Sequence, residues 1–317
     1  MSAINPIGSR GAFTAEATRS FTLPSRFYHD AEIYQQELER IFHRSWCYLG
    51  HASQLQNTGD QIVDQIADQR ITLERTDSIR IKALIESQAI GLVDCQGLLF
   101  GNLDPNAAAF KTEYPGLEAI FAEQVPELQN YACAYDLTFD IAANWKVVVD
   151  NFSEGYHIPV AHKQLSKVLD SGNNNKATIE NRYAFLESKS KTGFPGFELE
   201  AGLPYMSWTI WPNTCLLREP GCDNLIVLRM APNGPTRCIE RADILSPGGE
   251  ISPNLEAIKA LFAESFDLED ISIVESVQRG LQSRGYDQSR YVADDNNAWY
   301  SEAGLHKFHK LILEALN

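Results

Sequence analysis

Residues 143–162 read ANWKVVVDNFSEGYHIPVAH and place His157 and His162 five positions apart, with Pro159 between them. Five positions correspond to about 140° around an ideal helix, so two ligands at that spacing on one helix would diverge. Because a proline inside a helix loses a hydrogen bond and clashes with the preceding turn, we expect the helix to end near His157 and the chain to bring His162 back toward it. Glu154, three positions before His157, lies on the same helical face. The spacing alone is equally compatible with another interpretation, in which the two histidines simply lie at a helix end near the surface.

A third candidate ligand is Asp270, in the segment SFDLEDISIVESVQRGL (265–281). It lies at the centre of an apolar stripe at helical spacing, formed by Phe266, Ile273, Val274, Val277 and Leu281. A carboxylate that faces a core is costly unless it is paired or binds a metal. The alternative is an N-terminal helix carboxylate that the helix dipole stabilises. Two imidazoles and one carboxylate form the facial triad of non-haem Fe(II) oxygenases. The alternative is a zinc site for hydrolysis, but the helical HExxH pattern of such sites is absent from this sequence.

The segments around these ligands predict a mixture of helices and strands. Helices are expected at 30–46, 143–157, 253–283 with a break near Phe266, and 301–316. Strand-like runs occupy 60–66, 70–75, 79–85, 97–103, 132–141, 205–211, 224–232 and 236–245. Residues 1–22 are expected to form a loose arm and 173–176 a loop. An antiparallel sheet backed by long helices is the α+β arrangement that fits this pattern.

The stretch at 143–162 resembles the iron motif of Rieske non-haem iron oxygenase large (alpha) subunits. In that family Asn-Trp-Lys precedes Asn-Phe-x-Glu/Asp-x-x-His-x4-His, which this chain matches from Asn144 to His162. The N-terminal FTLPSRFYHDAEIYQQELERIFHRSW (21–46) and the segment from Glu269 to the C-terminus are also similar. The likeness is strongest to the branch of carnitine, glycine betaine and choline monooxygenases. It implies a truncated Rieske-like β domain at residues 1–105 and a helix-grip catalytic domain at residues 106–317.

The resemblance also implies roles for individual residues. His157, His162 and Asp270 would bind one mononuclear Fe(II). Glu154 would occupy the position of the bridging carboxylate that connects this iron to the cluster of a neighbouring subunit. Asn151 would be a polar residue close to the iron.

The family's [2Fe-2S] ligands, Cys-x-His and Cys-x-x-His, are missing from this chain. None of the six cysteines has a histidine two or three positions later. The chain passes from RITLERTD (70–77) almost directly into SIRIKALI (78–85), where a typical relative carries the cluster-bearing segment. We therefore expect no [2Fe-2S] cluster in this chain, and a smaller sheet from the strands at 60–103.

The implied reaction is O2-dependent hydroxylation of a small organic substrate by a Rieske-type mono- or dioxygenase component, an oxidoreductase. Likeness to the quaternary-amine branch would add N-demethylation or C–N cleavage. YMSWTIW (205–211) could hold a quaternary ammonium by cation–π contact, with aromatic core packing as the alternative. Electrons would come from a cluster-bearing paralogue or an NAD(P)H-dependent reductase, within a homo- or hetero-trimer. The alternative is a non-catalytic iron-binding or scaffold subunit, or an inactive deletion product.

The composition limits which binding partners and which cellular compartment we expect for this protein. The net charge of −15 argues against a nucleic-acid or anionic-membrane surface. No apolar run approaches the roughly 18–20 residues of a membrane span, and we expect no secretory signal. The six scattered cysteines suggest reduced thiols in a cytoplasm.

Overall fold

The computed structural model describes residues 11–163, 165–169, 177–188, 203–294, 296, 298 and 300–317. The side chains of residues 167, 168 and 265–268 lie outside this description. So do the expected loop at 173–176 and residues 1–10 of the expected arm.

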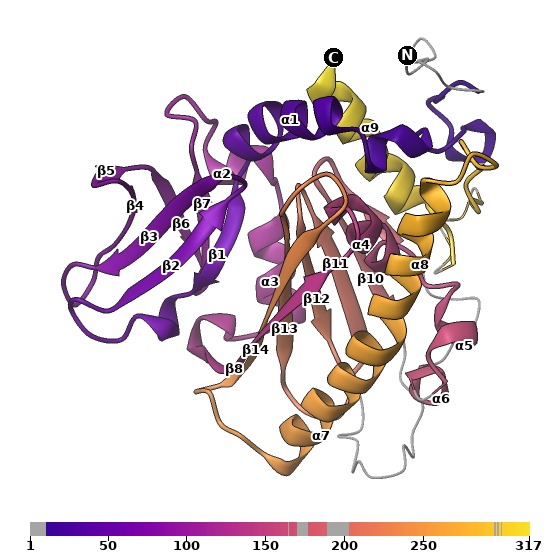
Figure 1. The fold of residues 1–317 in the computed structure, drawn as a ribbon. Helices are drawn as coiled ribbons and strands as arrows, with labels where there is room; N and C mark the ends of the chain where they lie inside the picture. Colours follow the sequence, from indigo (N-terminus) through magenta and orange to yellow (C-terminus); the bar gives the residue numbers. More distant parts are fainter. Residues whose placement is uncertain are drawn as a thin grey trace.

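A seven-stranded antiparallel sheet occupies the centre of the molecule, in the order β8-β14-β13-β12-β11-β10-β9 (Figure 1). Its strands are β8 (Tyr131–Ile141), β9 (Ala177–Ile179), β10 (Tyr183–Ser188), β11 (Tyr205–Ile210), β12 (Thr214–Arg218), β13 (Leu225–Pro232) and β14 (Cys238–Pro247). The strands expected near 132–141, 205–211, 224–232 and 236–245 are thus confirmed, whereas β9, β10 and β12 were not expected. Every residue of β12 and β13 is buried, so these strands form the inside of the molecule.

Consecutive C-terminal helices cross this sheet in one long run, and the last helix lies apart from them beside α1 (Ala31–Arg40) (Figure 1). These elements are α7 (Pro253–Phe262), the π-helical segment η6 (Ala263–Asp270), α8 (Ile271–Leu281) and, after a loop, α9 (Ala303–Leu316). The expected break near Phe266 takes the form of η6. A π-helix has more residues per turn than an α-helix, so helical spacing counted from Phe266 does not carry across it. Within α8 itself the buried positions are Val274, Gln278 and Leu281, so Val277, expected in the buried stripe, is 45% exposed.

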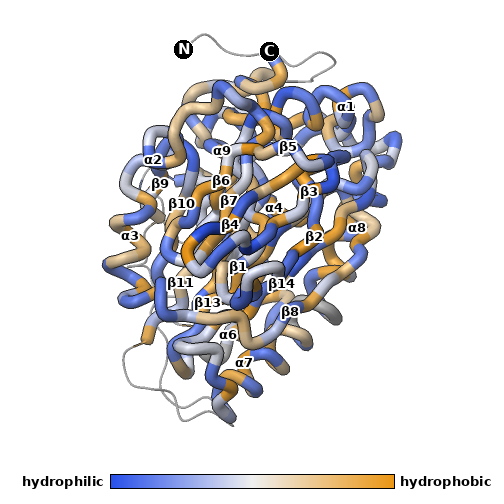
Figure 2. The backbone as a smooth tube through the Cα atoms, turned by 90° about the vertical axis from the view of Figure 1, so that its left-hand side faces the viewer, coloured by the Kyte–Doolittle hydropathy of each residue, from blue (hydrophilic) through white to orange (hydrophobic). Residues whose placement is uncertain are grey.

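The N-terminal part contains α1 and two small sheets. Asp30 caps α1 (Ala31–Arg40), which ends earlier than expected and is followed by a 3-10 turn at Phe42–Arg44. One sheet has the order β1-β7-β6 and the other β2-β3-β4-β5, so the single smaller sheet expected here is wrong. The strands are β1 (Cys47–His51), β2 (Gln61–Ile66), β3 (Gln69–Arg75), β4 (Ile81–Ile85), β5 (Gln88–Ala89), β6 (Gly91–Cys95) and β7 (Leu98–Asn102). Figure 2 shows hydrophilic and hydrophobic stretches mixed along them, in keeping with strands that are covered on one side.

Tight turns close three hairpins of these small sheets, and a longer connection, residues 76–80, joins β3 to β4. Two residues connect β2 to β3, β4 to β5 and β6 to β7. Left-handed backbone at Ala67, Glu86, Ser87, Gln96 and Gly97 makes these turns possible. The two short helices α2 (Phe110–Glu113) and α3 (Leu117–Gln124) then lead into the main sheet.

The Asn-Trp-Lys motif fastens α4 (Trp145–Phe152) to the rest of the molecule. Asn144 caps the helix and donates to the Pro235 carbonyl at 2.7 Å. Lys146 and Glu37 of α1 form an ion pair of 2.6 Å in which both side chains are fully buried. The Trp145 indole donates to the same carboxylate at 2.9 Å. This packing fixes the start of the segment that carries the two histidines.

Candidate metal centre

The two histidines flank a one-turn helix, α5 (Ile158–Ala161), rather than the end of a long one. The helix α4 ends at Phe152, earlier than the expected end near His157. His157 is the N-cap residue of α5 and His162 its C-cap, with Pro159 in the first turn. A proline is tolerated there because the N–H that it lacks would have no partner in the helix. Pro159 therefore starts a new helix, and this helix places the two rings 5.1 Å apart at an interplanar angle of 78°.

Asp270, the last residue of η6, completes the group. Its Oδ1 lies 3.0 Å from His162 Nε2 and 3.8 Å from His157 Nε2. One ligand atom from each of the three residues lies within 4.8 Å of the others. Within the described ranges, this is the only group of three or more such side chains that could hold a metal.

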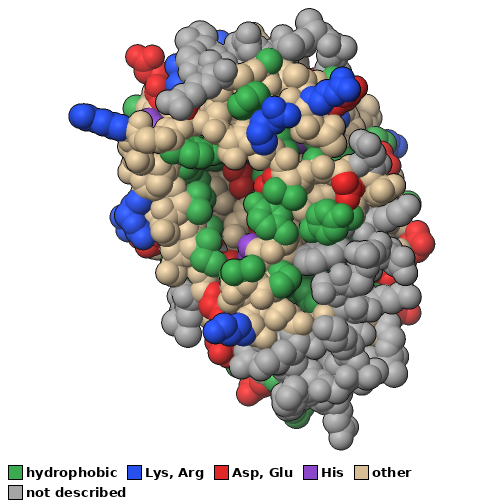
Figure 3. Space-filling view, turned by 90° about the vertical axis from the view of Figure 1, so that its right-hand side faces the viewer, with side chains coloured by type: hydrophobic (Ala, Val, Ile, Leu, Met, Phe, Trp, Pro, Cys, Tyr) green, Lys and Arg blue, Asp and Glu red, His purple; other side chains and the backbone are tan. Residues whose placement is uncertain are grey.

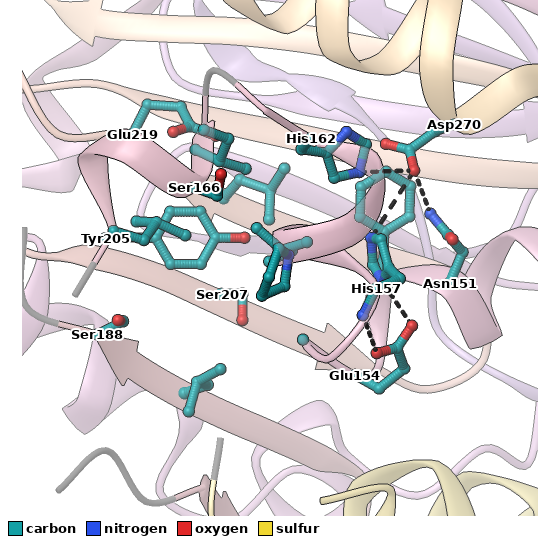
Figure 4. A pocket seen from close by; sticks show the side chains of 18 of the residues that line it. Asn151, Glu154, His157, His162, Ser166, Ser188, Tyr205, Ser207, Glu219 and Asp270 are labelled. Carbon is teal, nitrogen blue, oxygen red and sulfur yellow. Dashed lines mark hydrogen bonds and ion pairs between the residues drawn. The ribbon is translucent and has the colours of Figure 1, made fainter. Parts of the chain in front are cut away.

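Carboxylates and an amide support each member of this group, and Figure 4 shows the contacts of Glu154 with His157 and of Asn151 with Asp270. The Nδ1 atom of His157 contacts Glu154 Oε1, and the Nδ1 atom of His162 lies 2.8 Å from Glu269 Oε2. Both imidazoles therefore turn Nε2 toward Asp270. Asn151 donates from Nδ2 to Asp270 Oδ1 at 2.8 Å. Histidine ligands of metals are typically oriented in this way, by a carboxylate on the ring's other nitrogen.

The electrostatics of the group favour a positive charge at its centre. Asp270 is 6% exposed and His162 only 2%. Burial alone would lower the pKa of His162, but hydrogen bonds to Asp270 and Glu269, and their charges, raise it to about 9. The same carboxylates that stabilise an imidazolium would stabilise a metal cation in its place.

An inner cavity of about 270 Å³ opens beside these residues. Its wall on the main sheet consists of alternate residues of β10 and β11 and residues at the end of β12, namely Leu186, Ser188, Tyr205, Ser207, Leu217 and Glu219. Among the lining residues that the structure describes there is no lysine or arginine.

Only part of the aromatic stretch 205–211 reaches this cavity. Tyr205 and Ser207 line it. Trp208 packs between Phe121 and Phe185 on the other side of the strand. Trp211 donates to Ser45 Oγ at 3.0 Å, away from the cavity. Core packing thus accounts for both tryptophans, and Tyr205 is the one aromatic side chain of the stretch that lines the cavity.

A second depression, the outer groove, lies on the other side of Glu154. Figure 3 shows the face of the molecule on which it opens, with a hollow rimmed by hydrophobic side chains and with acidic and histidine side chains inside it. The groove has a volume of about 420 Å³, and Asn151, Glu154 and His157 line both the groove and the inner cavity. Its wall also contains a buried network in which Tyr28 and His309 both contact Asp150, at 2.8 and 3.1 Å. Glu154 therefore lies between the metal-ligand group and a depression on the surface of the chain.

Two side chains at this site were not expected from the sequence. Glu269 precedes Asp270, but the sequence does not show that it turns toward His162, which is more than a hundred positions away. Glu219 follows a strand that was not expected, and nothing near it in the sequence signals a pocket. Their role could have been found only by knowing which elements meet in space.

Comparisons with known proteins match this architecture. Residues 128–317 match the family described as ring hydroxylating alpha subunit (catalytic domain). The carnitine monooxygenase oxygenase subunit of Escherichia coli K12 is 27% identical, over 95% of this chain and 96% of that protein. The chloroplastic choline monooxygenase of Arabidopsis thaliana is 26% identical, over 93% of this chain and 82% of that protein.

A solved structure shows the same fold over almost the whole chain. It is a quaternary ammonium Rieske monooxygenase, described in terms of carnitine oxidation by gut microbiota and inter-subunit electron transfer. The TM-score is 0.87 at 22% identity, and the match covers 96% of this chain and 98% of that one. The expected α+β fold of a Rieske oxygenase alpha subunit is confirmed.

The alignment with the Escherichia coli relative is longer than this chain. It spans 358 positions, whereas this chain has 317 residues, so this sequence has gaps where the relative has residues. No helix in the described part of the chain has the length and apolar character needed to cross a lipid bilayer.

Proposed function

The chain belongs to the family of ring-hydroxylating alpha subunits, and we propose that it is an oxygenase subunit with one mononuclear Fe(II) bound by His157, His162 and Asp270. The observation that carries this proposal is the convergence of two imidazole Nε2 atoms and one carboxylate on a single point beside a cavity. Two histidines and a carboxylate are the donor set of mononuclear non-haem iron sites with open positions. A purely structural zinc site would normally have four protein ligands, and the structure brings together three.

The residues around the ligands have separate tasks in this proposal. Glu154 and Glu269 accept the Nδ1–H of the two histidines and keep each Nε2 directed at the metal position. Asn151 holds Asp270 Oδ1 in place through its amide. Bound at this point, Fe(II) would supply the binding and reductive activation of O2 for hydroxylation of a substrate in the inner cavity.

We further propose that electrons reach this site from the cluster of a partner subunit across Glu154. Glu154 suits this position because it lines the outer groove as well as the inner cavity. The chain has no Cys-x-His or Cys-x-x-His sequence of its own, so a cluster-bearing paralogue and an NAD(P)H-dependent reductase would supply the electrons. The same proposal includes assembly of the chain into a homo- or hetero-trimer. It also includes division of the chain into a Rieske-like domain at residues 1–105 and a catalytic domain at residues 106–317.

The proposed substrate is a small quaternary ammonium compound, converted by hydroxylation and, where carbon next to nitrogen is attacked, by N-demethylation or C–N cleavage. The names of the relatives, carnitine and choline monooxygenases, support this class. The volume of the inner cavity, about 270 Å³, suits a ligand of that size.

A second candidate function is that of an iron-binding or scaffold subunit that does not turn over. The missing cluster ligands favour it, because without electrons a mononuclear iron site cannot complete an oxygenase reaction. An inactive deletion product would also bind iron without turning over, but it would have no biological role.

Turnover in a mixed assembly separates the two candidates. The chain would be combined with a cluster-bearing homologue whose own iron ligands have been replaced by alanine, together with reductase, NADH, O2 and choline or carnitine. We expect product from the mixture, none from either component alone, and none when this chain carries His162→Ala. No product from a mixture in which this chain holds its full iron content would favour the non-catalytic candidate.

A further inference from the structure

Glu219 is a buried acid whose charge the described part of the chain leaves without a partner. Its side chain is 5% exposed, and Oε2 has no hydrogen-bond partner among the described residues. No described lysine or arginine forms an ion pair with it. Burial raises the pKa of Glu219 to about 7, although the charge of His162 lowers it. A carboxylate is normally buried only with a compensating cation or hydrogen bonds, so this position calls for an explanation.

The backbone around Glu219 is firmly fixed. Asn224, which is fully buried, accepts from the Glu219 N–H at 3.1 Å and donates to the Glu219 carbonyl at 2.7 Å. This pair of bonds holds the turn after β12 in one conformation. Glu219 therefore lines the inner cavity from a turn whose backbone is fixed.

The cavity around Glu219 is otherwise suited to an organic cation. Glu219 and Tyr205 lie on the side of the cavity away from Asn151 and Glu154, and the Tyr205 hydroxyl points toward its middle (Figure 4). Leu165, Leu186 and Leu217 supply apolar walls. With a divalent metal at the ligand group, the carboxylates of Asp270, Glu154 and Glu269 already offset its charge, and Glu219, when ionised, adds further negative charge to the cavity. An anionic ligand would be repelled there.

We infer that the Glu219 carboxylate is the anchor for the ammonium group of the substrate, and that it makes positive charge the main requirement for binding. Tyr205 contributes an aromatic surface beside the anchor, where a cation gains further from the ring. This inference rests on the proposed function only in taking the inner cavity as the substrate site.

Two ligands of the same shape test this charge requirement. Choline and 3,3-dimethylbutan-1-ol differ in that a quaternary nitrogen replaces a quaternary carbon, so their difference in affinity isolates the charge. Both would be titrated by calorimetry into the iron-loaded chain, and the iron content of each sample would be measured. The variants would be Glu219→Gln and the control Glu187→Gln, which removes one charge from an exposed position on β10.

We expect choline to bind the wild type more tightly than the alcohol, and Glu219→Gln to weaken choline by roughly ten- to a hundredfold, the scale of a contact to a charged group. The affinity for the alcohol should stay the same, and Glu187→Gln should change neither. The thermal midpoint of Glu219→Gln should be unchanged or higher, because the variant removes a buried unpaired charge. A merely structural Glu219 would show a lower midpoint instead.

Equal affinities for the two ligands, an unchanged preference in Glu219→Gln, or no choline binding by the iron-loaded chain would each overturn the inference. The proposed iron site would survive all three results, since the iron content of the samples reports on it separately. Loss of iron from the wild type would count against the proposed function itself.

Discussion

Glu154 contacts the Nδ1 atom of His157, and Glu269 contacts the Nδ1 atom of His162. Each fixes a tautomer, so that Nε2 is left free for a metal. Glu269 is the more informative of the two, because Glu154 also lines the outer groove and so has a second possible task. The side chain of Glu269 is 31% exposed and has His162 as its contact at 2.8 Å.

Glu269→Gln should therefore weaken Fe(II) binding by about ten- to a hundredfold, the usual effect of removing a supporting carboxylate. The glutamine keeps the shape of the side chain and loses the charge that orients His162. Competition with a calibrated Fe(II) chelator under anaerobic conditions would measure the affinity. Glu264→Gln, at an exposed position of the same π-helical segment, should have no effect, and an equal loss in both variants would contradict a specific role for Glu269.

At the scale of residues, the candidate metal ligands could be predicted from the sequence, but two of the acidic residues around them could not. Asp270 was predicted because a carboxylate within an apolar stripe is unusual, and the resemblance to the family's iron motif implied His157 and His162 as its partners. The structure brings all three together. Whether they bind iron stays a prediction. Glu219 and Glu269 gave no such signal, because acids are common at strand ends and on helices. Only the fold shows that these two are turned inward.

At the scale of elements, short segments and changes of helical type limited the prediction. Pro159 was read as the end of a long helix, but it starts the one-turn helix α5, and proline is compatible with either. In α8 the buried positions are Val274, Gln278 and Leu281, so that Val277, which was placed in the stripe, is exposed. The π-helical turn also places Glu269 and Asp270 next to the histidines, and π-helical turns are frequent at functional sites. Long strands with a strong apolar pattern, such as β13, were predicted correctly.

The tight turns of the small sheets lead to a prediction about stability. Gly97 closes the hairpin of β6 and β7 with φ +95°, and a Cβ there would lie 2.5 Å from His51 Nε2. Gly59 has a similar φ of +93°, but a Cβ there would meet nothing within 4 Å. Gly59→Ala should therefore cost only the left-handed backbone conformation, about 1–2 kcal/mol of unfolding free energy.

Gly97→Ala should cost more than Gly59→Ala, by about 1–3 kcal/mol, because the His51 ring must also move in a packed core. Urea unfolding followed by circular dichroism would give both free energies. Equal losses would show that the turn has room for a side chain and that the contact between β1 and the β6–β7 hairpin is loose.

At the scale of the whole molecule, the paired strands of the small sheets are joined by short connections. Three of these connections have two residues and the one between β3 and β4 has five, and the alignment with the carnitine monooxygenase subunit has gaps in this chain. Fold class and family could be predicted because the catalytic part keeps its motifs at recognisable spacing. The division of the N-terminal strands into two sheets could not, since alternating patterns do not specify which strands pair.

The purified chain should consequently contain no acid-labile sulfide and show no visible Rieske absorption, even when it is produced together with iron–sulfur assembly proteins. The reason is that no cysteine and histidine pair stands at ligand spacing. Sulfide analysis and electron paramagnetic resonance of the reduced protein would measure this, with a cluster-bearing homologue as the positive control. Stoichiometric sulfide in the isolated chain would mean that a cluster binds through other ligands, and electron supply by a partner would then be unnecessary.

The most direct measurement of the central claim is the iron content of the chain after anaerobic reconstitution and desalting, in the wild type and in two histidine variants. We predict about one Fe(II) per wild-type chain, the stoichiometry of a mononuclear site. His162→Ala should lose nearly all of it. His43→Ala, which removes a partly exposed histidine paired with Asp68 far from the ligand group in sequence, should keep it. Equal iron in the wild type and His162→Ala would contradict the assignment of His157, His162 and Asp270 as the metal site.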